Sequence, residues 1–253
     1  MTTTLITGAS SGLGAEMARQ LAALGHDLAL CARRTDRLAE LAEEITAAHG
    51  VRVEHRALDV NDHAQVREVT QAFAADFGRI DRYVVNAGLG KGAPVGTGRP
   101  DANLETVEVN VLGALAQAEA AMEVFRAQHH GHLVLVSSVA ALRGLPGPVT
   151  TYAATKAFVA SLGEGLRHEL LGRPDLDIRV TTIFPGYIRS EMNEHVRGTP
   201  FMAGTVEGVR AMVEAIEAER PAARVPGWPW GPLGGAMRVA PLPVLRRMVG
   251  GRG

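Results

Sequence analysis

Residues 3–14 read Thr-Thr-Leu-Ile-Thr-Gly-Ala-Ser-Ser-Gly-Leu-Gly, and this stretch decides the fold. Its first half is a short apolar run of the kind that forms a buried strand. Its second half places Gly8, Gly12 and Gly14 at the start of a predicted helix, Leu13–Leu24. Glycine permits a tight turn and a close backbone approach to a pyrophosphate, and a helix start offers free N–H groups to phosphates. The spacing G-x-x-x-G-x-G differs from the commoner G-x-G-x-x-G, but its place between a strand and a helix favours nucleotide binding over a plain glycine turn.

Short apolar runs alternate with longer amphipathic segments through most of the chain. Strands are predicted at Thr3–Thr7, Asp27–Ala32, Arg52–Ala57, Arg82–Asn86, His132–Ser137 and Ile178–Phe184. Helices are predicted at Leu13–Leu24, Asp36–His49, Asp62–Phe77, Ala102–Gln128, Thr151–Leu171 and Thr205–Glu219. This alternation indicates βαβ units with right-handed crossovers. The predicted fold class is therefore α/β, a doubly wound parallel sheet with helices on both faces.

Glycine or polar motifs follow all six predicted strands. They are Gly8–Gly14, Arg33–Arg34, Asp59–Val60, Asn86–Gly88, Ser138 and Pro185–Gly186. In such a sheet, ligands bind in the crevice at the carboxyl ends of the strands. We therefore expect these six motifs to meet in one binding site.

The residues after the second strand indicate which dinucleotide would bind. Folds that prefer NAD usually place an acidic residue there, whereas this chain has Arg33 and Arg34. A guanidinium binds a 2′-phosphate that a carboxylate would repel, so we expect NADP(H). Alternatively, one or both arginines, Arg34 more than Arg33, only begin the next helix in solvent. Asp59 could accept a bond from the adenine amino group beside Val60, or could only cap the helix that starts near Asp62.

Tyr152 and Lys156 lie four residues apart in a predicted helix, so they share one face. A phenol has a pKa of about 10 and carries protons poorly at neutral pH. A neighbouring ammonium favours the phenolate and moves that pKa toward the working range. With the serine pair Ser137–Ser138 nearby in sequence, the pattern indicates proton and hydride chemistry.

Together these motifs resemble the short-chain dehydrogenase/reductase (SDR) family from residue 3 to about residue 190. The matching elements are Thr7-Gly8-x-x-x-Gly12-x-Gly14, Asp59-Val60, Asn86-Ala87-Gly88, Asn110, Ser138, Tyr152-x-x-x-Lys156 and Pro185-Gly186. The resemblance implies a Rossmann fold, and Arg33 looks like the basic residue of members that use NADP(H). It also implies a homodimer or homotetramer through helices 102–128 and 151–171.

The resemblance assigns the catalytic roles. Tyr152 would be the general acid in carbonyl reduction, Lys156 would hold the nicotinamide ribose and lower the phenol pKa, and Ser138 would bind the substrate oxygen. Asn110 would hold a helix kink and a water that relays protons. The predicted cofactor-binding residues are Gly8, Ser10, Ser11, Gly12, Leu13, Gly14, Arg33, Arg34, Asp59, Val60, Asn86, Ala87, Gly88, Tyr152, Lys156, Pro185, Gly186, Ile188 and Ser190. Ser190 stands where the family usually has threonine.

The predicted function is an NADP(H)-dependent oxidoreductase that interconverts a ketone or aldehyde and its alcohol, with reduction favoured. One alternative is an NAD-dependent alcohol dehydrogenase of the same fold. Another is a catalytically silent nucleotide-sensing or scaffold protein, against which stands the complete set of Asn110, Ser138, Tyr152 and Lys156. We expect a small-molecule carbonyl or alcohol substrate, and the composition does not separate a small ketone from a lipid, steroid or polyketide.

The composition of the chain argues against several other classes of protein and of site. A net charge of −1 gives no electrostatic drive toward nucleic acid or membrane. The single cysteine, Cys31, excludes an internal disulfide and fits a reducing compartment. We find no secretory signal and no run of about 18 apolar residues, so we expect a cytoplasmic protein without a spanning helix. His129, His130 and His132 lack partners at ligand spacing, and we expect no metal site.

The composition shifts near residue 220. Residues 221–253 hold both tryptophans, six of the 13 prolines, five arginines and no acidic residue. We predict a catalytic domain over residues 1–220, with a substrate lid at about 187–204, and a C-terminal appendage at 221–253. Within it, residues 223–227 could replace the short closing strand of the family. The rest could be a terminal helix on the protein's own surface, could cover the substrate pocket, could contact a membrane interface peripherally, or could pack on another subunit.

Overall fold

The computed structural model of the protein describes residues 2–193 and 201–249, and its centre is a seven-stranded sheet. The strand order is β3-β2-β1-β4-β5-β6-β7, and every neighbouring pair is parallel. The strands are β1 (Thr3–Thr7), β2 (Asp27–Ala32), β3 (Val53–Ala57), β4 (Arg82–Val85), β5 (His130–Val136), β6 (Asp177–Pro185) and β7 (Ala222–Val225). The chain moves outward from β1 in one direction and from β4 in the other, so the topology reverses between these two strands. The predicted doubly wound Rossmann fold is confirmed.

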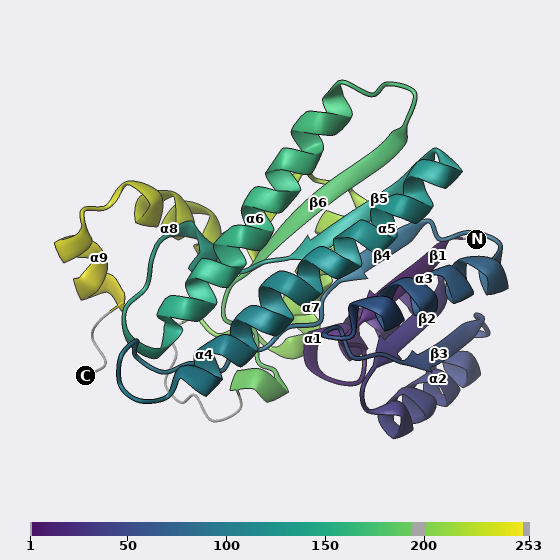
Figure 1. Ribbon diagram of the computed structural model, residues 1–253, viewed down its shortest axis with the longest axis horizontal. Coiled ribbons are helices and arrows are strands. Elements are labelled where there is room, and N and C mark those ends of the chain that lie inside the picture. Colours follow the sequence, from purple (N-terminus) through teal and green to yellow (C-terminus); the bar gives the residue numbers. More distant parts are fainter. Residues whose placement is uncertain (1, 194–200, 250–253) are drawn as a thin grey trace.

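Helices cover both faces of this sheet (Figure 1). One face packs against α1 (Gly12–Ala23), α2 (Thr35–His49) and α7 (Thr205–Glu217). The other face packs against α3 (His63–Phe77), α5 (Ala114–Gln128) and α6 (Thr150–Leu171). No described helix is long and apolar enough to cross a membrane.

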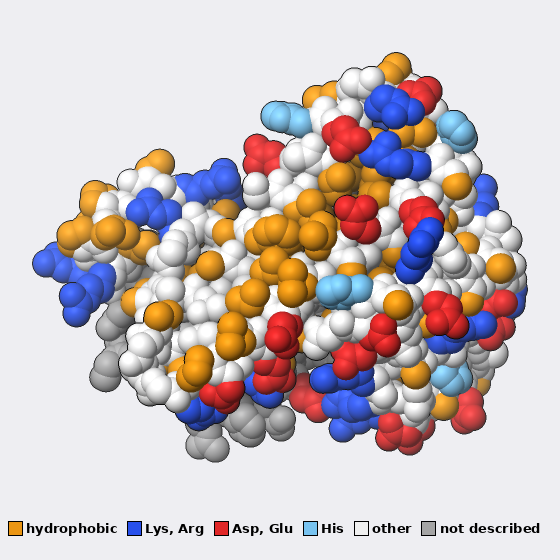
Figure 2. Space-filling view, viewed as in Figure 1, with side chains coloured by type: hydrophobic (Ala, Val, Ile, Leu, Met, Phe, Trp, Pro, Cys, Tyr) orange, Lys and Arg blue, Asp and Glu red, His pale blue; other side chains and the backbone are white. Residues whose placement is uncertain are grey.

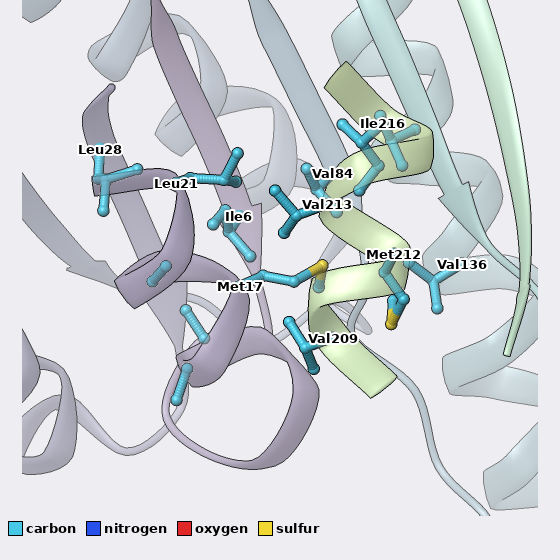
Figure 3. Close-up of a cluster of buried hydrophobic side chains, with 14 of the residues drawn as sticks. Ile6, Met17, Leu21, Leu28, Val84, Val136, Val209, Met212, Val213 and Ile216 are labelled. Atoms are coloured by element: carbon cyan, nitrogen blue, oxygen red, sulfur yellow. The ribbon is translucent and has the colours of Figure 1, made fainter. Parts of the chain in front are cut away.

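Alternation along the strands builds two separate cores. Ile6 on β1 points to the α1 and α7 side, while its neighbour Leu5 points to the α3 and α5 side. Figure 3 shows the first core, in which Met17 of α1 meets Val209 and Val213 of α7 over the central strands. Each such side chain contributes about 1.5–3 kcal/mol when fully buried. These contacts fix the helices that carry the site residues.

The predicted helix at 102–128 is divided in the structure. It comprises α4 (Pro100–Val107), a π-helical turn at Glu108–Gly113 and α5. Asn110 lies in this turn, where its side chain exchanges two hydrogen bonds with the backbone of Leu89, both 2.8 Å long. A π turn inserts one extra residue, which a periodicity argument does not anticipate. Asn110 therefore lies where the helical hydrogen-bonding pattern changes, at the place where the resemblance implied a kink.

The C-terminal segment continues the sheet and then forms two helices. β7 pairs with β6 at the edge, so residues 222–225 supply a closing strand, whereas the sequence suggested residues 223–227. α8 (Gly227–Val239) packs against β7 and against a 3-10 turn at Val139–Leu142, and α9 (Leu242–Val249) follows. α8 thus lies on the protein's own surface, directly beside the segment that follows Ser138.

Candidate active site

A cavity of about 480 Å³ opens at the carboxyl ends of the strands. All of the predicted cofactor-binding residues line it, from Gly8 on the first turn to Ser190 after β6. Ser138, Tyr152 and Lys156 line the same cavity, whereas Asn110 is buried behind it. The cavity size lies within the range of about 300–1,000 Å³ typical of ligand pockets. The six strand ends therefore do converge on one site.

The glycine turn after β1 packs closely against neighbouring backbone, which leaves no room for side chains at Gly8 and Gly14. Gly8 has φ +64°, and a Cβ atom at Gly14 would lie 2.4 Å from the carbonyl oxygen of Gly8. Asn86 donates from Nδ2 to the carbonyl of Thr7 at 2.9 Å, which ties the end of β4 to this turn. The N-cap residue of α1, Ser11, makes no side-chain capping bond, so it leaves the first-turn N–H groups to other acceptors. This cradle fits a dinucleotide pyrophosphate.

The side chains of the residues that follow β2 and β3 differ in whether they bind other residues of the chain. Asp62 caps α3 by accepting from the N–H of Gln65 at 3.0 Å, so the capping role considered for Asp59 belongs to Asp62. Asp59 accepts from the Asn61 N–H at 3.0 Å and lines the cavity. Arg33 is exposed, lines the cavity and forms no ion pair with any residue that the structure describes. Asp59 and Arg33 are therefore available to a ligand.

The Arg34 side chain, in contrast, forms hydrogen bonds with other residues of the chain. Its guanidinium pairs with both carboxylate oxygens of Glu191 at 2.9 Å and donates to Ser11 Oγ at 2.6 Å. Glu191 also lines the cavity. Sequence reasoning missed Glu191, because it lies about 157 positions from Arg34 and no local pattern connects them.

Ser138, Tyr152 and Lys156 are assembled from β5 and α6. The Lys156 ammonium lies 5.9 Å from the centre of the Tyr152 ring and donates to the carbonyl of Val136 at 2.9 Å. Ser138 accepts from the N–H of Ala140 at 3.1 Å, which fixes its hydroxyl at the cavity wall. Ser137 donates to the carbonyl of Lys156 at 2.7 Å, so its hydroxyl is already engaged in holding β5 against α6.

Burial controls the protonation of this group. It raises the pKa of Tyr152, and the neighbouring Ser138 hydroxyl lowers that pKa by less. Burial also lowers the pKa of Lys156 to about 8. The direction for Tyr152 is opposite to the one expected from Lys156, because removal from water outweighs an ammonium that is directed at Val136.

Asn110 is linked to α6 by hydrogen bonds that run through Thr155. Its Nδ2 group donates to Thr155 Oγ1 at 3.1 Å, and that hydroxyl donates to the carbonyl of Tyr152 at 2.8 Å. A Cβ atom at Gly88 would lie 3.3 Å from both Asn110 Oδ1 and Lys156 Nζ. Asn110 is therefore close to Lys156 without lining the cavity itself.

The segment after β6 forms part of the cavity wall. Ile188 is buried and its carbonyl accepts from Asn193 Nδ2 at 2.7 Å, while the Ser190 N–H donates to Asn193 Oδ1 at 2.9 Å. Met192 and Asn193 also line the cavity. Residues 194–200 of the predicted lid lie outside the described residues. No described group of three or more His, Cys, Asp or Glu side chains is arranged to hold a metal ion.

The first residues of α8 reach the wall of the site. Trp230 is buried, stacks edge-on against Tyr187 at 5.4 Å between ring centres, and has no hydrogen-bond partner for its N–H among the described residues. A Cβ atom at Gly186 would lie 2.0 Å from that ring nitrogen. The tail therefore supports the backbone that follows β6.

We expect Gly186→Ala to lower the free energy of unfolding by about 1–3 kcal/mol, because the added methyl group must displace the buried Trp230 ring. Urea titration followed by tryptophan fluorescence would measure this change. Gly235→Ala is the matched control, since nothing lies within 4 Å of a Cβ atom there. Equal stability of both variants and the wild type would show that Trp230 does not pack as described.

A family model described as short chain dehydrogenase matches residues 2–200 of the chain. The protein belongs to the short-chain dehydrogenase family. Among relatives of this short-chain dehydrogenase, an uncharacterised oxidoreductase of Mycobacterium tuberculosis is 51% identical over 244 residues, which cover 96% of this chain and 95% of the relative. An uncharacterised oxidoreductase of Myxococcus xanthus is 38% identical over 216 residues, covering 85% and 83%.

Solved structures show the same fold for other short-chain dehydrogenases. One from Sphingobium yanoikuyae, in complex with NADPH, has a TM-score of 0.81 and 30% identity and covers 94% of each chain. Another from Burkholderia phymatum, in complex with NAD, has a TM-score of 0.79 and 25% identity and covers 88% of each chain. The family is thus an oxidoreductase family, and these two neighbours were solved with different cofactors.

Proposed function

We propose that this short-chain dehydrogenase is an NADP(H)-dependent carbonyl reductase acting on a ketone or aldehyde. The observation that carries the proposal is that Ser138, Tyr152 and Lys156 line the same cavity as the glycine turn and Arg33. A proton donor, a hydrogen-bond donor and a nucleotide cradle are the three parts that carbonyl reduction requires.

A bound nicotinamide supplies the hydride to the carbonyl carbon, and the protein supplies the rest. Tyr152 donates its phenolic proton to the carbonyl oxygen, so the carbonyl becomes an alcohol and Tyr152 becomes a phenolate. The Ser138 hydroxyl donates a hydrogen bond to the same oxygen and stabilises its growing negative charge. Lys156 would hold the ribose hydroxyls of the bound cofactor, and its ammonium would stabilise the phenolate. Asn110, which lies close to Lys156 at Gly88, would hold the water through which solvent returns the proton.

The preference for NADP(H) rests on Arg33 and on the absence of an acidic residue at the end of β2. An exposed guanidinium at the cavity rim is suited to a 2′-phosphate, which it can bind in a bidentate manner. The Sphingobium neighbour was solved with NADPH. With cellular NADPH as reductant, the reaction would run toward the alcohol.

We expect Arg33→Ala to weaken NADPH binding by about tenfold and to leave NADH binding within about twofold, because only NADPH carries the 2′-phosphate. Fluorescence titration with both cofactors would measure this. Arg67→Ala, which removes an exposed arginine of α3 that pairs with Glu123, is the control. Undiminished NADPH affinity in Arg33→Ala would contradict the assignment of Arg33.

The proposed function itself is tested with a panel of ketones and aldehydes, measured by loss of NADPH or NADH absorbance. Carbonyl-dependent oxidation of NADPH is the expected result. Cofactor binding without turnover across the panel would favour the silent nucleotide-sensing alternative. The second enzymatic candidate is NAD-dependent alcohol oxidation, and one observation favours it: Glu191 places a carboxylate against Arg34.

We also propose that the protein is a homo-oligomer. Figure 2 shows apolar side chains gathered over the face formed by α5 and α6. Leu112 beside α5 and Leu171 at the end of α6 are exposed on these elements. An apolar area of this kind on two long helices is suited to association with a second copy.

A further inference from the structure

Glu191 occupies a site built from groups that bind anions. Its carboxylate oxygens lie 2.9 Å from two nitrogens of Arg34, and one oxygen lies 3.2 Å from Arg37 Nη1. The Ser11 hydroxyl accepts a hydrogen bond from Arg34 Nη2 at 2.6 Å. Ser10 Oγ accepts from Arg34 Nε at 3.3 Å, which completes the arrangement. Of these groups, Ser10, Ser11, Arg34 and Glu191 line the same cavity as the glycine turn.

The same groups are the ones a phosphate monoester would use. Guanidinium groups bind phosphate and carboxylate in the same bidentate manner, and hydroxyl groups donate to either. Arg33, which is one residue away from Arg34, lines the cavity beside this site. Because Arg33 and Glu191 both line this cavity, a 2′-phosphate bound there would experience the negative charge of Glu191.

We infer that Glu191 is a specificity-determining residue that competes with the 2′-phosphate of the dinucleotide for Arg34 and the neighbouring serines. Removal of its charge then shifts cofactor preference toward NADPH. This inference deepens the proposed function and rests on a nicotinamide dinucleotide binding in the cavity. It assigns the balance between the two cofactors to one carboxylate from the segment after β6.

Two physical considerations set the size of the effect. The Arg34 guanidinium, with smaller contributions from Ser11 and Arg37, lowers the pKa of the Glu191 carboxyl to about 2, so the carboxylate is charged at every pH used for assays. The side chains of Arg34 and Glu191 are 42% and 45% exposed, so solvent screens the competition. We therefore expect a change of about three- to tenfold in cofactor preference rather than a complete switch.

The test compares dissociation constants for NADPH and NADH in the wild type and in Glu191→Gln, by fluorescence titration of the full chain. Glu191→Gln should bind NADPH about three- to tenfold more tightly and NADH within about twofold. Glu44→Gln is the matched control, because Glu44 forms an equally short bidentate pair with Arg19 on a different surface. It should leave both constants unchanged.

The double variant Arg34→Ala/Glu191→Gln isolates the contact itself. If the two residues act through their pair, Glu191→Gln should have little effect on the NADPH to NADH ratio in an Arg34→Ala background. A Glu191→Gln ratio equal to that of the wild type, or one shifted toward NADH, would overturn the inference. Glu191→Ala, with folding checked by circular dichroism, serves as the second variant should Glu191→Gln be unstable.

The ratio of the NADPH and NADH dissociation constants of the wild type distinguishes a failure of this inference from a failure of the proposed function. A wild type that prefers NADH would contradict the proposed NADP(H) preference. The same result would leave the inference intact if Glu191→Gln moved the ratio toward NADPH. A wild type that prefers NADPH, with a ratio that Glu191→Gln does not change, would support the proposed function and reject the role of Glu191.

Discussion

Tyr152→Phe is expected to reduce carbonyl reduction by about 10²- to 10⁴-fold while leaving cofactor affinity within about twofold. The ring and its packing are retained, and only the hydroxyl that donates the proton is lost. Because burial raises the pKa of Tyr152, the phenol is protonated at neutral pH and ready to act as an acid. Initial rates with NADPH, together with a binding titration, would measure both quantities.

The matched control for this variant is Tyr83→Phe. It makes the same chemical change in β4, inside the core and away from the cavity. Its turnover should stay within about twofold of the wild type at a temperature where both are folded. Wild-type turnover in Tyr152→Phe would remove Tyr152 from the mechanism, whereas equal losses in both variants would indicate a general effect on folding.

Lys156→Met is expected to be almost inactive and yet more stable than the wild type at pH 7. The ammonium is buried, and burial lowers its pKa from 10.5 to about 8. That difference corresponds to about 3 kcal/mol of unfavourable free energy for the charged form in the folded protein. Part of the gain is offset, because the variant loses the bond from Lys156 to the Val136 carbonyl, so we expect a net gain of about 1–2 kcal/mol.

The pH dependence identifies the cause of this gain. Below about pH 8 the folded wild type carries the buried charge and the full penalty. Between about pH 8 and 10.5 the folded protein releases the proton before the unfolded chain does, so the wild type gains stability relative to Lys156→Met. Urea titrations at pH 7 and pH 10 would measure the difference. Lys91→Met changes an exposed lysine paired with Glu105. Its free energy of unfolding relative to the wild type should be the same at pH 7 and pH 10.

The strands and the cradle were accessible from the sequence because their signals are local. The apolar run at residues 3–7, the glycines that follow it and the helix behind them are contiguous, so they predict strand, turn and helix together. The carboxyl ends of parallel strands share one edge, so the six motifs could be assigned to one crevice without coordinates.

Features that depend on long-range packing were not accessible. The family resemblance implied a kink at Asn110, but its two bonds to the backbone of Leu89, in the segment after β4, could not be predicted from local pattern. The pair of Arg34 and Glu191 brings together residues that follow β2 and β6. The raised pKa of Tyr152 depends on how much of the phenol is removed from water, and helical spacing alone indicates only the position of Lys156. The packing of α8 against the turn that follows Ser138 likewise depends on tertiary contacts, as does that of Trp230 with Tyr187.

The central claim is that Ser138, Tyr152 and Lys156 act on a carbonyl next to a bound nicotinamide. The most direct measurement uses NADPH that carries deuterium at both C4 positions, with mass spectrometry of the alcohol formed from a turned-over ketone or aldehyde. We predict that the wild-type product gains one deuterium at the carbinol carbon and that Tyr152→Phe forms about 10²- to 10⁴-fold less of it. An alcohol product without deuterium, or no cofactor-dependent product from any carbonyl compound tested, would contradict the account.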